Sequence, residues 1–110
     1  MLAGVRREGD APEGTEEILL DVTDAEQIRG AAERVDQLDG LVNNAGIALA
    51  SPLELVPVDQ LRYQLEVNLV GQVAVTQALL PALRRSKGGI VFIGSIAGRS
   101  ALPFLAPYAA

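Results

Sequence analysis

Leu41-Val42-Asn43-Asn44-Ala45-Gly46 is an apolar pair that runs into a turn of two asparagines, an alanine and a glycine. Short apolar runs bounded by turn residues are typical of buried strands. Two further runs flank it in the chain, Ile18-Leu19-Leu20-Asp21-Val22 and Ile90-Val91-Phe92-Ile93, and the second leads into Gly94-Ser95. All three predict buried parallel strands with polar residues at their carboxyl ends.

The segments between these runs have helical spacing. Apolar residues recur from Asp24 to Val35, and Asp24 or the preceding threonine is a suitable N-cap. Residues 60–85 predict a long helix that is apolar on more than one face, so it should pack on the sheet and on a partner. Leu2–Val5 predicts the end of an earlier strand. This alternation predicts an α/β fold with a doubly wound parallel sheet, in which ligands bind at the carboxyl ends of strands.

The amino-acid composition excludes several kinds of catalytic and binding site. The chain has 110 residues, a net charge of −5, and neither cysteine nor histidine. A disulfide framework, a thiolate nucleophile and a histidine base are therefore excluded, and no metal site is predicted. The acidic balance argues against nucleic-acid binding. No apolar stretch approaches the ~20 residues of a membrane span and no signal peptide is evident, so a soluble cytoplasmic protein is predicted.

Three polar residues stand out, each with an ordinary alternative. Asn68 lies between apolar residues inside the long helix, where asparagine is unfavourable, and it is either a satisfied core amide or a functional group. Ser95 follows a strand and either caps the backbone or binds substrate. Tyr108, in Pro107-Tyr108-Ala109-Ala110, is either a surface residue or an acid/base whose pKa of ~10 needs a nearby cation to fall.

Asn68 precedes Ser95 by 27 residues, and Ser95 precedes Tyr108 by 13. Together with the Asn43–Gly46 turn, this pattern resembles the active-site skeleton of the classical short-chain dehydrogenase/reductase family, over nearly the whole chain. The resemblance implies a Rossmann-like fold and hydride transfer between NAD(P) and a carbonyl or secondary alcohol. It implies that Tyr108 is the general acid or base, that Ser95 positions the substrate oxygen, and that Asn68 holds a water in a proton relay.

The same resemblance implies a set of cofactor-binding residues. Asn43, Ala45 and Gly46 would line the ribose on the adenosine side, whereas Asn44 would tie adjacent strands together through its amide. Asp21 would bind the adenine amino group, and Val22 would pack on the adenine ring. Tyr108 would also lie beside the cofactor.

Arg6 and Arg7 follow the predicted strand at Leu2–Val5. They are either solvated surface residues or a clamp for the 2′-phosphate of NADP, because guanidinium matches phosphate geometry. The strand carries no acidic residue that could bind a free 2′-hydroxyl. NADP is therefore favoured over NAD, with Arg6 as the candidate ligand.

Two family features are missing from the chain. A glycine-rich turn that cradles the pyrophosphate is absent, and the lysine expected four residues after Tyr108 would lie beyond Ala110. Residues 1–110 are thus expected to be the central part of a single NAD(P)-binding Rossmann-like domain that lacks its first βα unit and the region after the tyrosine. The family strand order 3-2-1-4-5-6-7 implies that the missing strand joins the two halves of the sheet. The isolated fragment is expected to be inactive, and unstable, oligomeric or aggregation-prone.

The sequence predicts an oxidoreductase as the parent protein. The stretch Gly94–Arg99, followed by Leu102–Leu105, resembles members that act on apolar alcohols, so a small apolar carbonyl or alcohol is the expected substrate. A homo-oligomer through the long helix at 60–85 is expected. The alternatives are a non-catalytic nucleotide-binding member, a structural module that dimerises, and an extended-type epimerase or dehydratase on the same fold.

Overall fold

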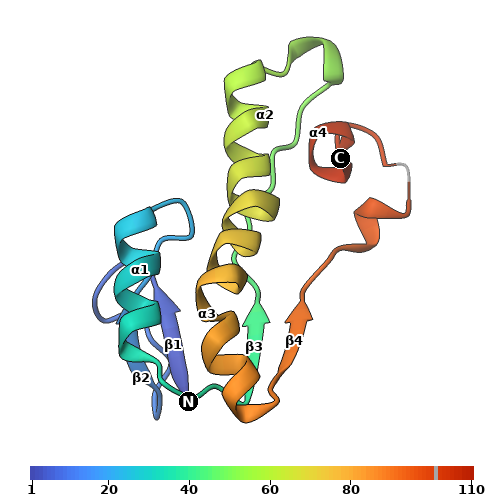
Figure 1. The fold of residues 1–110 in the computed structure, drawn as a ribbon. Helices are drawn as coiled ribbons and strands as arrows, with labels where there is room; N and C mark the ends of the chain where they lie inside the picture. Colours follow the sequence, from blue (N-terminus) through green and yellow to red (C-terminus); the bar gives the residue numbers. More distant parts are fainter. Residues whose placement is uncertain (101) are drawn as a thin grey trace.

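The computed structural model describes residues 1–100 and 102–110. Four parallel strands form two separate pairs. β1 (Leu2–Val5) pairs with β2 (Glu16–Leu19), and β3 (Gly40–Asn43) pairs with β4 (Gly89–Phe92). Figure 1 shows the two pairs with the long helical segment between them in this view, next to β3. The parallel α/β arrangement is as predicted, and the sheet is incomplete.

The first helix forms where the sequence predicts it. α1 spans Ala25–Arg34, and the Asp24 carboxylate accepts hydrogen bonds from the backbone N–H groups of Glu26 and Gln27. These bonds satisfy donors that the first helical turn leaves free, so Asp24 rather than Thr23 is the N-cap. The buried Ile28 of α1 packs on the buried Leu79 and Leu83 of the long helix, and these contacts form the main apolar core.

The predicted helix at 60–85 is one continuous helical rod with a change of pitch. α2 (Val58–Leu65) leads into a π-helical segment, Glu66–Gly71, and then into α3 (Gln72–Ser86). Lys87 ends the rod in a left-handed conformation, with φ 54°. Wider turns of this kind are frequent at functional sites, and here the π segment contains Asn68.

Two strand predictions need correction. The run 18–22 is a strand only to Leu19, so Asp21 and Val22 follow the strand rather than close it. β4 was expected to be buried, but all four of its residues are exposed, and Phe92 is 52% exposed. Its apolar side chains are uncovered because its main neighbour among the described residues is β3, while α3 packs on β3 itself.

Short elements complete the described chain. Leu53–Leu55 and Ile96–Gly98 are 3₁₀ turns, and the short helix α4 (Ala106–Ala109) contains Tyr108. None of the helices in the described residues has the length and hydropathy that crossing a membrane requires.

Candidate functional site

Two clefts open at the carboxyl ends of the strands and share one wall. The first, of about 260 Å³, is lined by residues from the ends of β1 and β2 and from the helical rod. The second, of about 400 Å³, is lined by the rod, the end of β4 and the segment around Tyr108. Residues Asn44–Ile47, which follow β3, line both clefts. The predicted site therefore consists of two adjoining chambers divided by the asparagine–alanine–glycine turn.

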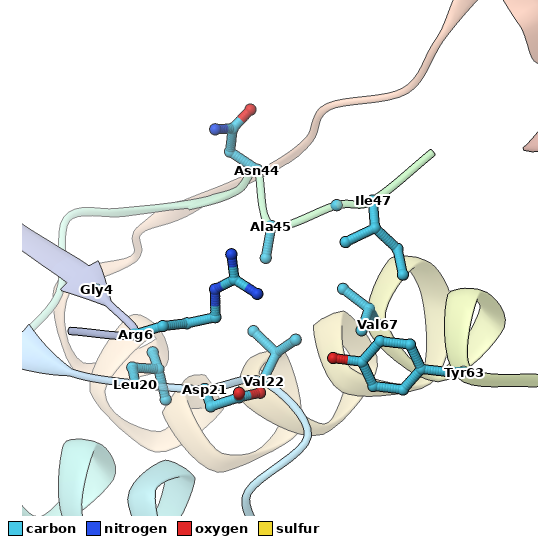
Figure 2. A pocket seen from close by; sticks show the side chains of 11 residues that line it. Gly4, Arg6, Leu20, Asp21, Val22, Asn44, Ala45, Ile47, Tyr63 and Val67 are labelled. Atoms are coloured by element: carbon cyan, nitrogen blue, oxygen red, sulfur yellow. The ribbon is translucent and has the colours of Figure 1, made fainter. Parts of the chain in front are cut away.

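The first cleft contains most of the predicted cofactor-binding residues: Arg6, Asp21, Val22, Ala45 and Gly46. Figure 2 shows the Arg6 guanidinium reaching across the cleft towards Ala45, with Asp21 and Val22 beside it. A guanidinium, a carboxylate and a branched apolar side chain are gathered within one concave surface. That combination suits a ligand with an anionic group, a hydrogen-bond donor and an aromatic face.

The Asp21 carboxylate is held by its own loop. Its Oδ1 accepts from the backbone N–H of Thr23 at 2.9 Å and from the Thr23 hydroxyl at 2.7 Å. The pKa of Asp21 is lowered by the backbone bond from Thr23, then by the Thr23 hydroxyl, and further by the positive charge of Arg6; slight burial opposes these effects. Asp21 is therefore ionised at neutral pH and can accept a hydrogen bond from a ligand.

The second cleft contains Asn68, Ser95 and Tyr108, the three residues predicted to be catalytic. They come from the π segment of the rod, from the end of β4 and from α4 respectively. Ser95 is exposed, and its Oγ accepts from the Ala97 backbone N–H at 3.2 Å, which is the capping role considered above. This bond uses the oxygen as acceptor only, so the hydroxyl proton of Ser95 remains available as a donor.

Asn68 makes two hydrogen bonds to one residue. Its Oδ1 accepts from the Ile47 N–H and its Nδ2 donates to the Ile47 carbonyl, both at 2.8 Å. The amide is thus a satisfied structural group that fixes the wall between the clefts. Asn68 also lines the second cleft, so this structural role leaves it beside Ser95 and Tyr108.

The two asparagines of the turn are arranged in the reverse of the expected way. Asn43 is buried and lines neither cleft; its Nδ2 donates to the Thr76 hydroxyl at 2.9 Å, so it ties β3 to α3. Asn44, expected to be the structural residue, is exposed and lines both clefts. The reason is the alternation of strand side chains, because adjacent residues at a strand end point to opposite faces.

Three other polar residues of the rod were not singled out from the sequence. Side chains spaced by four along the rod bind every second residue of the extended segment 43–49, as the pairs Thr76–Asn43, Gln72–Ala45, Asn68–Ile47 and Gln64–Leu49. Four helical residues rise about 6 Å and two extended residues about 6.6 Å, so the two repeats match. The signal in the sequence is the four-residue spacing of polar side chains within an apolar helix.

Tyr63 was also not predicted to be a site residue. It lines the first cleft one helical turn before Val67, and Figure 2 shows its hydroxyl directed towards Val22. In the sequence, only the position of Tyr63 one helical turn before Val67 could have indicated that it lines the cleft.

Comparison with known proteins agrees with the geometry. The family model described as short chain dehydrogenase matches residues 6–110, and the chain belongs to this family. It is 50% identical over 78 residues to a 3-amino-tetrahydro-pyrrolizinone reductase of Xenorhabdus hominickii, covering 71% of the chain and 27% of that protein. It is 41% identical over 102 residues to human 17-beta-hydroxysteroid dehydrogenase type 1, covering 90% of the chain and 31% of that enzyme.

Solved structures show the same fold. A short chain dehydrogenase from Burkholderia cenocepacia in complex with NADP superposes with a TM-score of 0.86 at 34% identity, covering 96% of this chain and 46% of the other. The chain thus spans about a third of the curated relatives named above and under half of this structure. The fold is a Rossmann-type α/β fold of an oxidoreductase family.

Proposed function

We propose that the full-length gene product transfers a hydride between NADP or NAD and a carbonyl or secondary alcohol. The observation that carries this proposal is the convergence of Asn68, Ser95 and Tyr108 on one cleft that adjoins a second cleft suited to a nucleotide. Residues 1–110 would be the central part of a single NAD(P)-binding domain, and the match to the family over residues 6–110 supports this.

The side chains of the second cleft would handle the substrate oxygen and its proton. In reduction the Tyr108 hydroxyl gives its proton to the carbonyl oxygen, and in oxidation the phenolate takes the proton of the alcohol. Ser95 donates a hydrogen bond to the same oxygen and stabilises the charge that develops there. Hydride transfer would be the chemistry supplied by a nicotinamide cofactor held between the two clefts. Asn68 holds the Ile47 backbone at the cleft wall, where a relay water would bind.

The first cleft would bind the adenosine end of the cofactor. The ionised Asp21 can accept from the adenine amino group, Val22 can pack on the ring, and Arg6 can pair with a 2′-phosphate. Ala45 and Gly46 lack bulky side chains, so a ribose can approach the wall between the clefts closely. Arg6 is the reason for favouring NADP over NAD.

Two arginines side by side provide a matched test. Arg6 lines the cleft, whereas Arg7 lines neither cleft and is exposed. In the full-length gene product, Arg6→Ala should weaken NADPH binding by about 10-fold or more, since a charge-assisted hydrogen bond is worth ~1.5–3 kcal/mol, and should hardly change NADH binding. Arg7→Ala should change neither. Equal losses in the two variants, measured by cofactor fluorescence titration, would remove Arg6 from this role.

The partners follow from the exposed apolar surface. Ile93 lines the second cleft and is 52% exposed, and Ile96, which follows the lining residue Ser95, is 76% exposed; both support a small apolar substrate. Leu69, Val70 and Val73 are exposed on the rod, which supports a homo-oligomer through this helix. We also propose that the protein works in the cytoplasm, on the basis of its acidic composition. Binding of NADPH without any turnover would favour a non-catalytic member of the family instead.

A further inference from the structure

We propose that Gln64 is a positioning residue that sets the place of Tyr108 in the second cleft. Gln64 is only 1% exposed, although glutamine is a strongly polar residue. Its Oε1 accepts from the Leu49 N–H at 2.7 Å, and its Nε2 donates to the Pro107 carbonyl at 2.5 Å. This inference rests on the proposed function, in which Tyr108 transfers the proton.

The segment that carries Tyr108 is held by contacts with other parts of the chain. Within α4 the Ala109 N–H binds the Leu105 carbonyl at 2.8 Å. A bond inside a helical turn fixes the turn's own backbone but not where the turn lies in the fold. The place of Tyr108 is therefore set by contacts from other elements.

Gln64 makes such a contact with the backbone directly before Tyr108. The Pro107 carbonyl belongs to the same planar peptide unit as the Tyr108 nitrogen, so holding the carbonyl orients the backbone from which the tyrosine side chain projects. Pro107 is itself fully buried against the rod. A second bond, from the Ser51 N–H to the Phe104 carbonyl at 2.8 Å, holds the chain three residues earlier but does not fix this peptide plane.

Gln64 also joins Tyr108 to the rest of the catalytic set. Asn68 lies four residues further along the rod and binds Ile47, while Gln64 binds Leu49 in the same extended segment. The side chains of Gln64 and Asn68 therefore share one helix face and one partner strand. Through them, the tyrosine segment and the wall between the clefts are fixed to a single rigid helix. Losing the Gln64 amide would leave that segment free to shift relative to Asn68.

The first measurement uses the unaltered full-length gene product. In NMR spectra, the Gln64 side-chain amide protons should exchange slowly with water and show a scalar coupling through the hydrogen bond to the Pro107 carbonyl carbon. Rapid exchange without this coupling would overturn the inference. This observation does not depend on activity, and no substitution that could prevent folding is involved.

The second measurement compares two glutamines of the same rod. Gln64→Met removes both bonds at nearly constant volume and should shift the amide resonances of Tyr108 and Ala109. Gln72→Met is the matched control, because Gln72 is also buried but donates to the Ala45 carbonyl. It should shift Ala45 and leave Tyr108 unchanged. Equal Tyr108 shifts in both variants, or none in either, would contradict the inference.

Kinetics of the full-length gene product separate positioning from general damage. Gln64→Met should lower kcat by about 10- to 100-fold, the scale expected for misplacing a reacting group by about 1 Å, and leave cofactor affinity unchanged. An unchanged kcat would overturn the inference, as would a matching loss of cofactor affinity, which would indicate a general structural defect. Absence of turnover in the unaltered protein would refute the proposed function, while the NMR measurements would still decide the place of Tyr108.

Discussion

Glycine at position 71 allows the helical rod to pass directly over the end of β2. A Cβ atom placed on Gly71 would lie 2.6 Å from the Val22 carbonyl oxygen and 2.8 Å from Val22 Cγ2. Ordinary contacts begin at 3.4 Å, and the atoms that are met belong to the backbone and to a stiff β-branched side chain. Gly71→Ala must therefore push the rod away from Val22.

A second glycine variant separates the cost of the close contact at Gly71 from the gain in helix propensity. Gly30 lies within α1, and a Cβ added there meets nothing within 4 Å. Both positions are helical, so both alanine variants gain about 1 kcal/mol of helix propensity. Only Gly71→Ala also carries the cost of overpacking, about 1–3 kcal/mol. The difference in unfolding free energy between the two variants should therefore be about 1–3 kcal/mol, with Gly30→Ala the more stable.

Urea unfolding of the full-length gene product, followed by circular dichroism, measures this difference. The chain concentration must be the same for both variants, because association would make the apparent stability depend on it. In the full-length gene product, Gly71→Ala should also weaken NADPH binding, since Val22 lines the first cleft. If Gly71→Ala were as stable as Gly30→Ala, the rod could not lie as close to Val22 as described, and the geometry of the first cleft would be wrong.

Further predictions concern charge and assembly. Thr23→Val removes the hydroxyl bond to Asp21 and should raise the pKa of that carboxyl, measured by NMR titration. Because the folded pKa of Asp21 is lowered, its stabilising contribution is present above the ordinary value of 3.8 and is lost as pH falls through the lowered value; an unchanged titration would contradict this. Val73→Glu should shift the full-length gene product towards monomer in light scattering, and an unaltered mass would exclude this face. The 110-residue chain alone should associate with rising concentration; a reversible, cooperative melt of a monomer at micromolar concentration would refute this expectation.

The parts of the fold that the sequence predicted correctly are those with local signals. Asp24 before an amphipathic stretch predicted α1, and the apolar run ending at Asn43 predicted β3. The exposure of β4 could not be predicted, because Ile90 and Phe92 are apolar whether or not another element covers them. Burial depends on long-range packing rather than on the strand's own residues.

In the site, too, features with a local signal in the sequence could be predicted, whereas those that depend on long-range packing could not. The spacing of Asn68, Ser95 and Tyr108 indicated residues that the structure gathers in one cleft. The placement of the Asn43 and Asn44 side chains could not be predicted, because adjacent residues at a strand end face opposite ways and the sequence does not reveal which one points inward. Gln64 was missed because a glutamine in a helix is ordinarily exposed, and its partner Pro107 lies 43 residues away.

The proton transfer assigned to Tyr108 is the central claim, and Tyr108→Phe in the full-length gene product tests it most directly. The substitution removes one hydroxyl oxygen and retains the aromatic ring. Turnover, followed as the oxidation of NADPH by a carbonyl substrate, should fall by about 10²- to 10⁴-fold, while the dissociation constant for NADPH stays unchanged. Turnover retained at the level of the unaltered protein would contradict the account.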